Sequence, residues 1–145
     1  MAETLALIKP DAVMRGLVGR IITRFEEKGF EFVRLRLVQM GPLQAGQLYA
    51  KFAGKPFFND LIDFMTSGPS IAMILVHLCD AGAVATLRKM AGAVDHRVDL
   101  DAAQPGTIRG DFAENFRQNV IHASDSTENA QREIRIFFPD YFDAL

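Results

Sequence analysis

The sequence predicts an α+β protein built on a ferredoxin-like β-α-β-β-α-β unit, in which helices cover one face of an antiparallel four-stranded sheet. Three observations support this fold class. Short apolar runs typical of strands recur along the chain, amphipathic segments lie between them, and their order fits a split β-α-β arrangement. A long loop is expected before the last strand. The chain has 145 residues, 49% of them hydrophobic, which suits a single domain over residues 1–145.

Four segments are predicted to be strands. Residues 4–8 form a short apolar run, which Pro10 ends because proline disfavours helix in the residue before it and cannot donate to a strand ladder. Apolar and charged residues alternate over residues 31–38, which indicates a strand with one face toward solvent or a partner. Residues 71–76 are typical of a central buried strand, and residues 120–121 of a brief last strand.

Apolar periodicity predicts the helices. One apolar face recurs over residues 17–25, and Lys28-Gly29 then supplies a basic last turn and a C-terminal glycine. Two shorter helices are expected around residues 43–52 and from Pro56, because proline suits a first helical turn. Another helix is expected at residues 80–90.

The segment from residue 91 to residue 111 lacks periodicity and is expected to be a loop of about 20 residues, a length that is commonly functional or mobile inside a compact domain. The last helix is expected to follow a cap at Asp125 or Ser126 and to run through Phe138.

Charge and cysteine content limit the classes of partner. Sixteen basic and eighteen acidic residues leave a net charge of −2, so no overall basic field exists for a nucleic-acid backbone and no specific nucleic-acid partner is expected. The single cysteine, Cys79, cannot form an internal disulfide, and no charged-then-apolar leader precedes the first strand. The longest apolar run is far shorter than the about 20 residues that span a bilayer. A cytoplasmic protein without a membrane partner is expected.

His122 is the candidate nucleophile. It is the one histidine in a polar neighbourhood at a predicted strand-to-helix junction, residues 119–126, and the other two histidines are interpreted as non-catalytic. A neutral imidazole can attack a phosphoryl group if an acceptor holds its second nitrogen, and Glu133 on the following helix could be that acceptor. On local composition alone, an ordinary core or surface histidine remains the more common alternative.

Residues 119–126 closely resemble the active-site signature of nucleoside diphosphate kinases, in which the phosphorylated histidine is followed by a small residue, serine and aspartate. Further matches follow in the same order along nearly the whole chain, in residues 9–11, 15–19, 25–30, 55–58, 67–69 and 105–112. The resemblance also supports the ferredoxin-like fold. It implies an enzyme that transfers the γ-phosphate of a nucleoside triphosphate, typically ATP, to a nucleoside diphosphate by a ping-pong route through a phosphohistidine.

The resemblance further implies Mg²⁺ bound with the nucleotide phosphates, and a homo-oligomer, either a tetramer or a hexamer. The alternating strand over residues 31–38 is a candidate for dimer pairing. No cluster of carboxylates with metal-loop spacing is found in the sequence, so no protein ligand to the metal is expected.

Carried over residue by residue, the resemblance implies the following roles. His122 takes the phosphoryl group on one ring nitrogen while Glu133 holds the other, and Ser124 bonds to Glu133 or to the site. Lys9 and Tyr49 donate toward the transferred group. The implied nucleotide-binding set is Lys9 and Asn119 at the ribose, Arg88 and Arg109 at the diphosphate, Phe57, Leu61 and Phe116 at the base, and Val94. Arginine suits this task because its guanidinium fork matches phosphate oxygens and stays charged.

Val94 is a departure from the family pattern, because family members commonly have a threonine there that donates to a phosphate oxygen. Losing one neutral hydrogen bond costs about 0.5–1.5 kcal/mol, unless His96, Arg97 or a backbone N–H replaces the donor. Other site residues have ordinary structural alternatives. Phe57 and Leu61 belong to an apolar stripe that is usually core, and Arg109 could cap backbone carbonyls.

Two other classes of function compete with the kinase. One is a non-enzymatic regulator on the same fold, and the joint presence of the residues named above weighs against it. The other is a ferredoxin-like nucleic-acid binder, which the net charge disfavours and for which affinity should depend steeply on salt. A P-loop ATPase mechanism is excluded because the chain has no Gly-x-x-x-x-Gly-Lys-Ser/Thr stretch.

Overall fold

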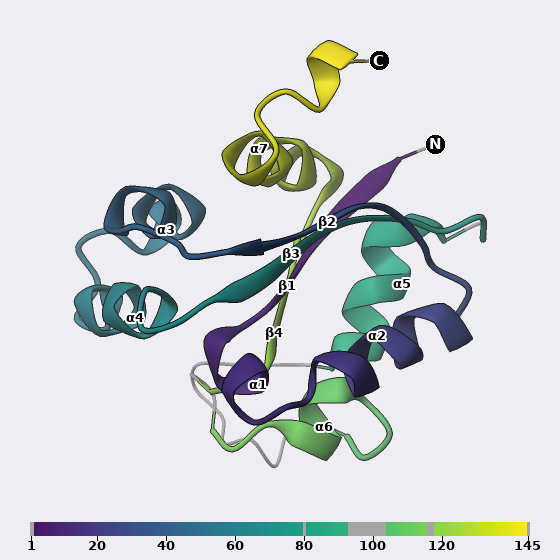
Figure 1. The fold of residues 1–145 in the computed structure, drawn as a ribbon, viewed down its shortest axis with the longest axis horizontal. Coiled ribbons are helices and arrows are strands. Elements are labelled where there is room, and N and C mark those ends of the chain that lie inside the picture. Colours follow the sequence, from purple (N-terminus) through teal and green to yellow (C-terminus); the bar gives the residue numbers. More distant parts are fainter. Residues whose placement is uncertain (1, 80, 93–103, 116–117, 145) are drawn as a thin grey trace.

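The structure is a computed structural model that describes residues 2–79, 81–92, 104–115 and 118–144 (Figure 1). Its sheet has the strand order β2-β3-β1-β4, and all neighbouring pairs are antiparallel. The strands are β1 (Glu3–Ile8), β2 (Glu31–Val38), β3 (Ser70–Val76) and β4 (Ile121–Ala123). This order and these directions confirm the predicted four-stranded antiparallel sheet.

Helices connect the strands and cover the sheet. They are α1 (Pro10–Met14), α2 (Val18–Glu27), α3 (Pro42–Leu48), α4 (Phe58–Met65), α5 (Gly82–Ala91), α6 (Ile108–Phe112) and α7 (Thr127–Phe137), with the 3-10 turns η1 (Ala50–Phe52) and η3 (Phe142–Ala144). Within the described part of the chain, no helix is long and apolar enough to cross a membrane.

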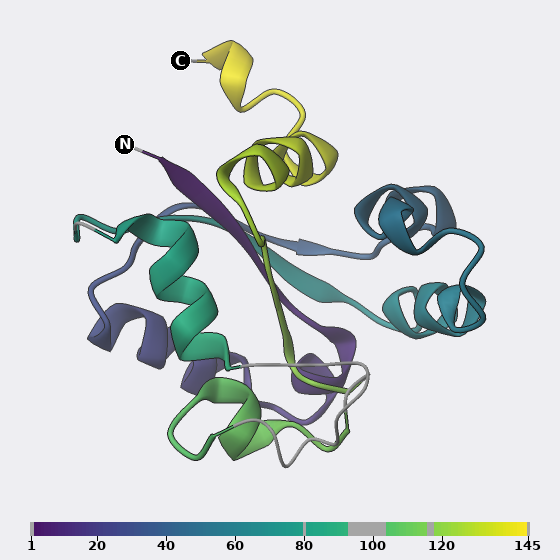
Figure 2. The ribbon, with the colours of Figure 1, turned by 180° about the vertical axis from the view of Figure 1, so that it is seen from behind.

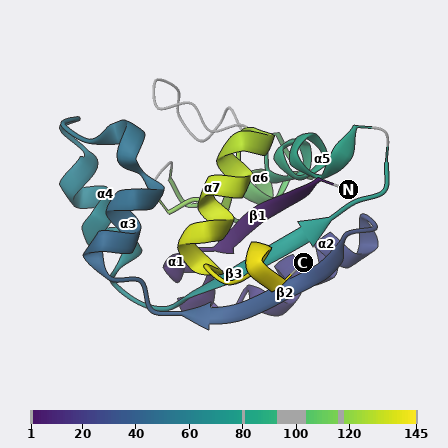
Figure 3. The ribbon, with the colours of Figure 1, turned by 90° about the horizontal axis from the view of Figure 1, so that it is seen from above.

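Helices cover both faces of the sheet, so the prediction of one covered face is wrong. Along β1, Ala6 and Ile8 pack with apolar residues of α2 and α5, whereas Leu5 and Leu7 pack with those of α3, α4 and α7. Figure 1 shows the two helical layers on either side of the strands, and Figure 3, seen from above, shows α7 lying over them. The reason is that β3 is buried along its whole length, and a sheet that is apolar on both faces needs cover on both.

Two short helices were absent from the sequence prediction. Helix α1 follows β1 directly, with Pro10 in its first turn, where the missing N–H costs no helical hydrogen bond. Helix α6 overlaps the end of the segment predicted as loop, and the hydroxyl of Thr107 caps it by accepting from the N–H of Gly110 at 3.0 Å. A five-residue helix is too short to show an apolar period. Residues 93–103, the greater part of the predicted loop, lie outside the described residues.

The register of β4 decides which way the candidate nucleophile points. His122 pairs with Leu7 of β1, and directly opposed residues share a face of the sheet. Leu7 packs in the cluster that contains Ile134 and Phe137 of α7, so His122 lies on the α7 side. Figure 2 shows β4 running up from the α6 region into the start of α7.

Ser126 begins the last helix. Its hydroxyl accepts a hydrogen bond from the backbone N–H of Asn129 at 3.1 Å, which satisfies a donor that the helix leaves unpaired. Of the two predicted caps, Ser126 is therefore the one that caps α7. The side chain of Asp125 makes different contacts, which belong to the pocket described next.

Candidate active site

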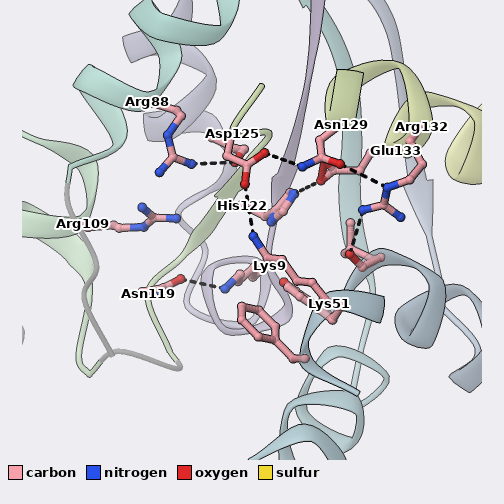
Figure 4. Close-up of a pocket in the computed structure, with 14 residues that line it drawn as sticks. Lys9, Lys51, Arg88, Arg109, Asn119, His122, Asp125, Asn129, Arg132 and Glu133 are labelled. Carbon is pink, nitrogen blue, oxygen red and sulfur yellow. Dashed lines mark hydrogen bonds and ion pairs between the residues drawn. The ribbon is translucent and has the colours of Figure 1, made fainter. Parts of the chain in front are cut away.

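A pocket of about 180 Å³ opens between the η1 turn, β4 and α7 (Figure 4). Side chains from widely separated segments meet there, because β1, β4 and α7 are packed side by side. The lining residues are Lys9, Leu48, Tyr49, Lys51, Phe52, Arg88, Arg109, Asn119, His122, Ala123, Asp125, Asn129, Arg132 and Glu133. Five of these are lysine or arginine, so the pocket is suited to an anion.

A chain of hydrogen bonds fixes the imidazole of His122. Its Nε2 hydrogen-bonds the Oε1 atom of Glu133, and the hydroxyl of Ser124 donates to Glu133 Oε2 at 2.9 Å. Glu133 is only 2% exposed, so its carboxylate is held in place and away from water. Because Nε2 is occupied, Nδ1 is the ring nitrogen that remains to react, an arrangement that also settles the tautomer and steadies a developing positive charge.

The backbone just before His122 takes an unusual conformation. Val120 has a φ of +67°, which is costly for a β-branched residue and persists only where the surroundings hold it. The N–H of Val120 donates to Asp11 Oδ2 at 3.2 Å, and its carbonyl accepts from the N–H of Lys9 at 2.8 Å. The turn into α1 therefore holds the bend that turns the chain into β4.

Lys9 is a buried cation at the floor of the pocket. Its Nζ donates to Asn119 Oδ1 at 2.8 Å, and the residue is 5% exposed. Burial, aided by the positive charge of Arg109, lowers the pKa of Lys9 to about 7, and the nearby carboxylate of Asp11 offsets only part of this. A bound anion would restore the charged form.

Tyr49 lies edge-on to the imidazole of His122, with ring centroids 5.8 Å apart. It is buried, and its hydroxyl has no hydrogen-bond partner among the residues that the structure describes. Burial, together with the negative charge of Glu133, raises the pKa of Tyr49, which keeps the phenol protonated. An unpartnered buried hydroxyl beside the reactive ring is a donor ready for a ligand oxygen.

The two arginines of the pocket are held differently. Arg109 donates to the carbonyls of Gly92 at 2.8 Å and Ile121 at 2.9 Å, so the predicted alternative of a carbonyl cap describes part of its role. Burial and the charge of Arg88 lower the pKa of Arg109 to about 10. Arg88 donates to the carbonyl of Ala123 over a longer distance of 3.3 Å, which is its one side-chain hydrogen bond to a residue that the structure describes.

The structure does not bring all predicted residues into the pocket. Leu61, on α4, is buried in the apolar core. Phe57 directly precedes α4, and its ring centroid lies 5.2 Å from that of Phe52 in an edge-on contact. Neither lines the pocket, although Phe52 does. Val94 and Phe116 lie outside the described residues.

Several lining residues were missed by the sequence analysis, among them Lys51, Asp125, Asn129 and Arg132. The guanidinium of Arg132 donates to the carbonyls of Gln47 at 2.7 Å and Leu48 at 3.3 Å, and so joins α7 to the end of α3. A signal was present for the α7 side, because Asn129 and Glu133 are four residues apart and share one face of α7, and Asp125 lies just before the helix begins. For Lys51 the sequence holds no such signal.

Three or more metal-ligating side chains do not meet anywhere in the described residues. The two carboxylates of the pocket, Asp125 and Glu133, are both engaged in hydrogen bonds to neighbouring side chains. A divalent cation in this pocket would therefore take most of its ligands from a bound phosphate and from water, which is how Mg²⁺ commonly accompanies nucleotides.

Comparison with known proteins agrees with this geometry. A family model described as nucleoside diphosphate kinase matches residues 2–141. A nucleoside diphosphate kinase from Staphylothermus marinus is 51% identical over 138 residues, which cover 95% of this chain and 93% of that protein. One from Thermoplasma volcanium is 51% identical over 140 residues, which cover 97% and 90%.

Solved structures resemble the chain as well. A crystal structure of nucleoside diphosphate kinase from Encephalitozoon cuniculi superimposes with a TM-score of 0.87 at 37% identity, covering 95% of this chain and 89% of that one. The Aquifex aeolicus nucleoside diphosphate kinase gives a TM-score of 0.84 at 37% identity, with 94% of each chain covered. Sequence, fold and pocket therefore agree, and the chain belongs to the nucleoside diphosphate kinase family.

Proposed function

We propose that the chain, an enzyme of the nucleoside diphosphate kinase family, transfers the γ-phosphate of a nucleoside triphosphate to a nucleoside diphosphate through a phosphohistidine at His122. The observation that carries this proposal is the buried chain of hydrogen bonds from Ser124 through Glu133 to Nε2 of His122, which leaves Nδ1 free for reaction inside a cationic pocket.

The chemistry is two displacements in series. In the first, Nδ1 of His122 forms a bond to the γ-phosphorus, the bond from that phosphorus to the β,γ-bridging oxygen breaks, and a nucleoside diphosphate leaves. In the second, the terminal oxygen of an acceptor diphosphate forms a bond to that phosphorus, the bond from the phosphorus to Nδ1 breaks, and the histidine returns to its first state. Glu133 holds the Nε2 proton in both steps, so the positive charge on the ring is balanced where it develops.

The remaining side chains neutralise and position the phosphates. In phosphoryl transfer the nucleophile is the one group of the protein that forms a covalent bond. Most of the catalysis therefore comes from cations and hydroxyl donors that position the phosphates and stabilise their negative charge. In this proposal Lys9 and the hydroxyl of Tyr49 donate toward the transferred group, and Arg88 and Arg109 bind the diphosphate. Asn119, which accepts from Lys9, serves the ribose end.

Mg²⁺ is the metal that this chemistry needs, and the residues present suit it because the pocket can hold a metal carried by phosphate oxygens and water. When bound, the ion neutralises charge on those oxygens.

Phe57 and Leu61 remain the candidates for binding the nucleotide base, together with Phe116. Phe57 is half-buried and its ring contacts Phe52, which lines the pocket, so a base stacked there would lie at the pocket's outer end.

We further propose that the protein is a cytoplasmic homo-oligomer, a tetramer or a hexamer. The support is the single exposed cysteine, which suits a reducing compartment, and the exposed Leu35 and Leu37 of the edge strand β2.

Intact-protein mass tests the mechanism. After brief exposure to ATP and Mg²⁺ without acceptor, the protein should gain one acid-labile phosphoryl group, about 80 Da, and lose it when GDP is added, because the phosphohistidine is an intermediate. The variant His122→Ala should gain nothing, and His77→Ala, which alters a histidine outside the pocket, should behave as the parent does. A parent that binds nucleotide and gains no phosphoryl group would overturn the mechanism.

A further inference from the structure

Lys51 and Asp125 form an ion pair across the mouth of the pocket. Lys51 Nζ lies 3.1 Å from Asp125 Oδ2, and the other oxygen of that carboxylate accepts from Asn129 Nδ2 at 2.6 Å (Figure 4). The two partners come from different parts of the fold, since Lys51 is in η1 and Asp125 is in the link between β4 and α7. The pair therefore links η1, which lies between α3 and α4, to the segment that directly follows β4 and His122.

Lys51 sits at the end of a row of aromatic rings that leads to the nucleophile. Its ammonium lies 5.2 Å from the ring centroid of Phe52. That ring stacks on Tyr49 at 6.2 Å between centroids, and Tyr49 is edge-on to His122. A cation held over an aromatic face keeps a defined position while its donors stay available.

Three other cations of the pocket are held by backbone carbonyls or enclosed by burial. Arg109 and Arg132 each donate to two backbone carbonyls. Lys9 donates to Asn119, and burial lowers its pKa to about 7. Within the described part of the chain, Arg88 donates to one backbone carbonyl, and the side chain of Lys51 donates to none. Of the lysines and arginines that line the pocket, only Lys51 forms an ion pair with a carboxylate there.

We propose that Lys51 is a phosphate-binding residue of this enzyme, and that Asp125 occupies it only while no nucleotide is bound. The incoming polyphosphate displaces the carboxylate from the ammonium, so the ion pair is exchanged for a contact between Lys51 and the nucleotide. This inference rests on the proposed function, because it names a further binding residue of the same site.

The energetics favour such an exchange. The side chains of Lys51 and Asp125 are 58% and 36% exposed, and exposed ion pairs contribute only about 0–1 kcal/mol. A polyphosphate brings more negative charge than one carboxylate, and it is also drawn by the neighbouring Arg88. Asp125 keeps its hydrogen bond from Asn129 when Lys51 moves to the phosphate, so the carboxylate still has a hydrogen-bond donor.

Equilibrium binding of a nucleoside diphosphate tests the proposal. We expect Lys51→Gln to weaken ADP binding by about three- to tenfold, because one charged contact to phosphate is lost, and to leave adenosine binding unchanged. Lys51→Arg, which keeps the charge, should bind ADP nearly as the parent does. The loss should shrink as salt is raised, since the contact is partly exposed. Thermal unfolding of each variant shows that it is folded.

A double-mutant comparison separates a phosphate contact from a structural ion pair. If Lys51 binds phosphate, Lys51→Gln weakens ADP binding in an Asp125→Asn background at least as much as in the parent. If Lys51 acts only by holding Asp125, its effect disappears in that background, and the proposal is wrong. An ADP affinity that Lys51→Gln leaves unchanged in both backgrounds overturns it as well. The phosphorylation assay of His122 is independent, so its failure would be recognised separately.

Discussion

Lys9 shows how burial at a single residue prepares a site for an anion. Its ammonium is almost fully enclosed, and burial together with the charge of Arg109 lowers its pKa to about 7. A negative ligand beside it favours the charged form, so the pKa of Lys9 rises again when phosphate binds. The group therefore changes charge on binding near neutral pH.

Proton uptake on nucleotide binding measures this change. At pH 8 the free protein has Lys9 mostly neutral, so we expect uptake that approaches one proton per chain on ADP binding, falling toward zero as the pH is lowered well below 7. Calorimetry in buffers of different ionisation enthalpy gives the number directly. Lys9→Met should abolish most of the uptake, and an equal uptake by this variant would assign the proton to another group.

At the scale of elements, the short helix α6 places Arg109. Thr107 caps it, and Gly110 lies in its first turn, where the backbone passes close to Gln104. A Cβ added at Gly110 would lie 2.0 Å from the carbonyl oxygen of Gln104. Because the obstacle is backbone and not the tip of a flexible side chain, the helix must move to relieve it.

Gly110→Ala should therefore destabilise the protein by about 1–3 kcal/mol, the usual cost of overpacking, and lower the affinity for nucleoside diphosphate through displacement of Arg109. The matched control is Gly19→Ala in α2, where an added Cβ meets nothing within 4 Å. Alanine there should raise stability by about 0.5–1 kcal/mol through helix propensity. Urea unfolding of both variants checks the pair, and equal stabilities would contradict the steric argument.

At the scale of the whole molecule, β2 lies at one edge of the sheet and exposes apolar side chains. Leu35 and Leu37 are 49% and 62% exposed, and in the described residues no strand covers the outer edge of β2. An edge strand with exposed leucines pairs readily with another chain. Association of two chains through β2, as in the proposed oligomer, would bury both leucines.

Leu37→Lys should weaken this association, because a charge replaces an exposed apolar side chain near the C-terminal end of β2. We expect the dissociation constant of the oligomer to rise by about tenfold or more, which sedimentation at a series of protein concentrations measures. Leu78→Lys, at a leucine that is 71% exposed beyond the end of β3, is the control. If both variants sediment as the parent does, β2 is not the contact.

The sequence by itself determined the strands, the amphipathic helices and the motif around His122. Each of these features depends on residues that are close together in the sequence, such as the apolar side chains at helical spacing in α2 or the N-cap at Ser126. The short helices α1 and α6 escaped prediction because five residues hold too little of a period. Family resemblance, not local pattern, singled out Arg88 and Arg109.

Only the tertiary structure decided which side chains meet. The register of β4 on β1 turns His122 toward Glu133, and the packing of η1 against α7 brings Lys51 to Asp125, 74 positions away in the chain. The same packing left Phe57 and Leu61 outside the pocket and put helices on both faces of the sheet. The spacing of apolar residues predicts that a residue is buried. The side chains that it contacts depend on strand order and register, which cannot be predicted from a local stretch of sequence.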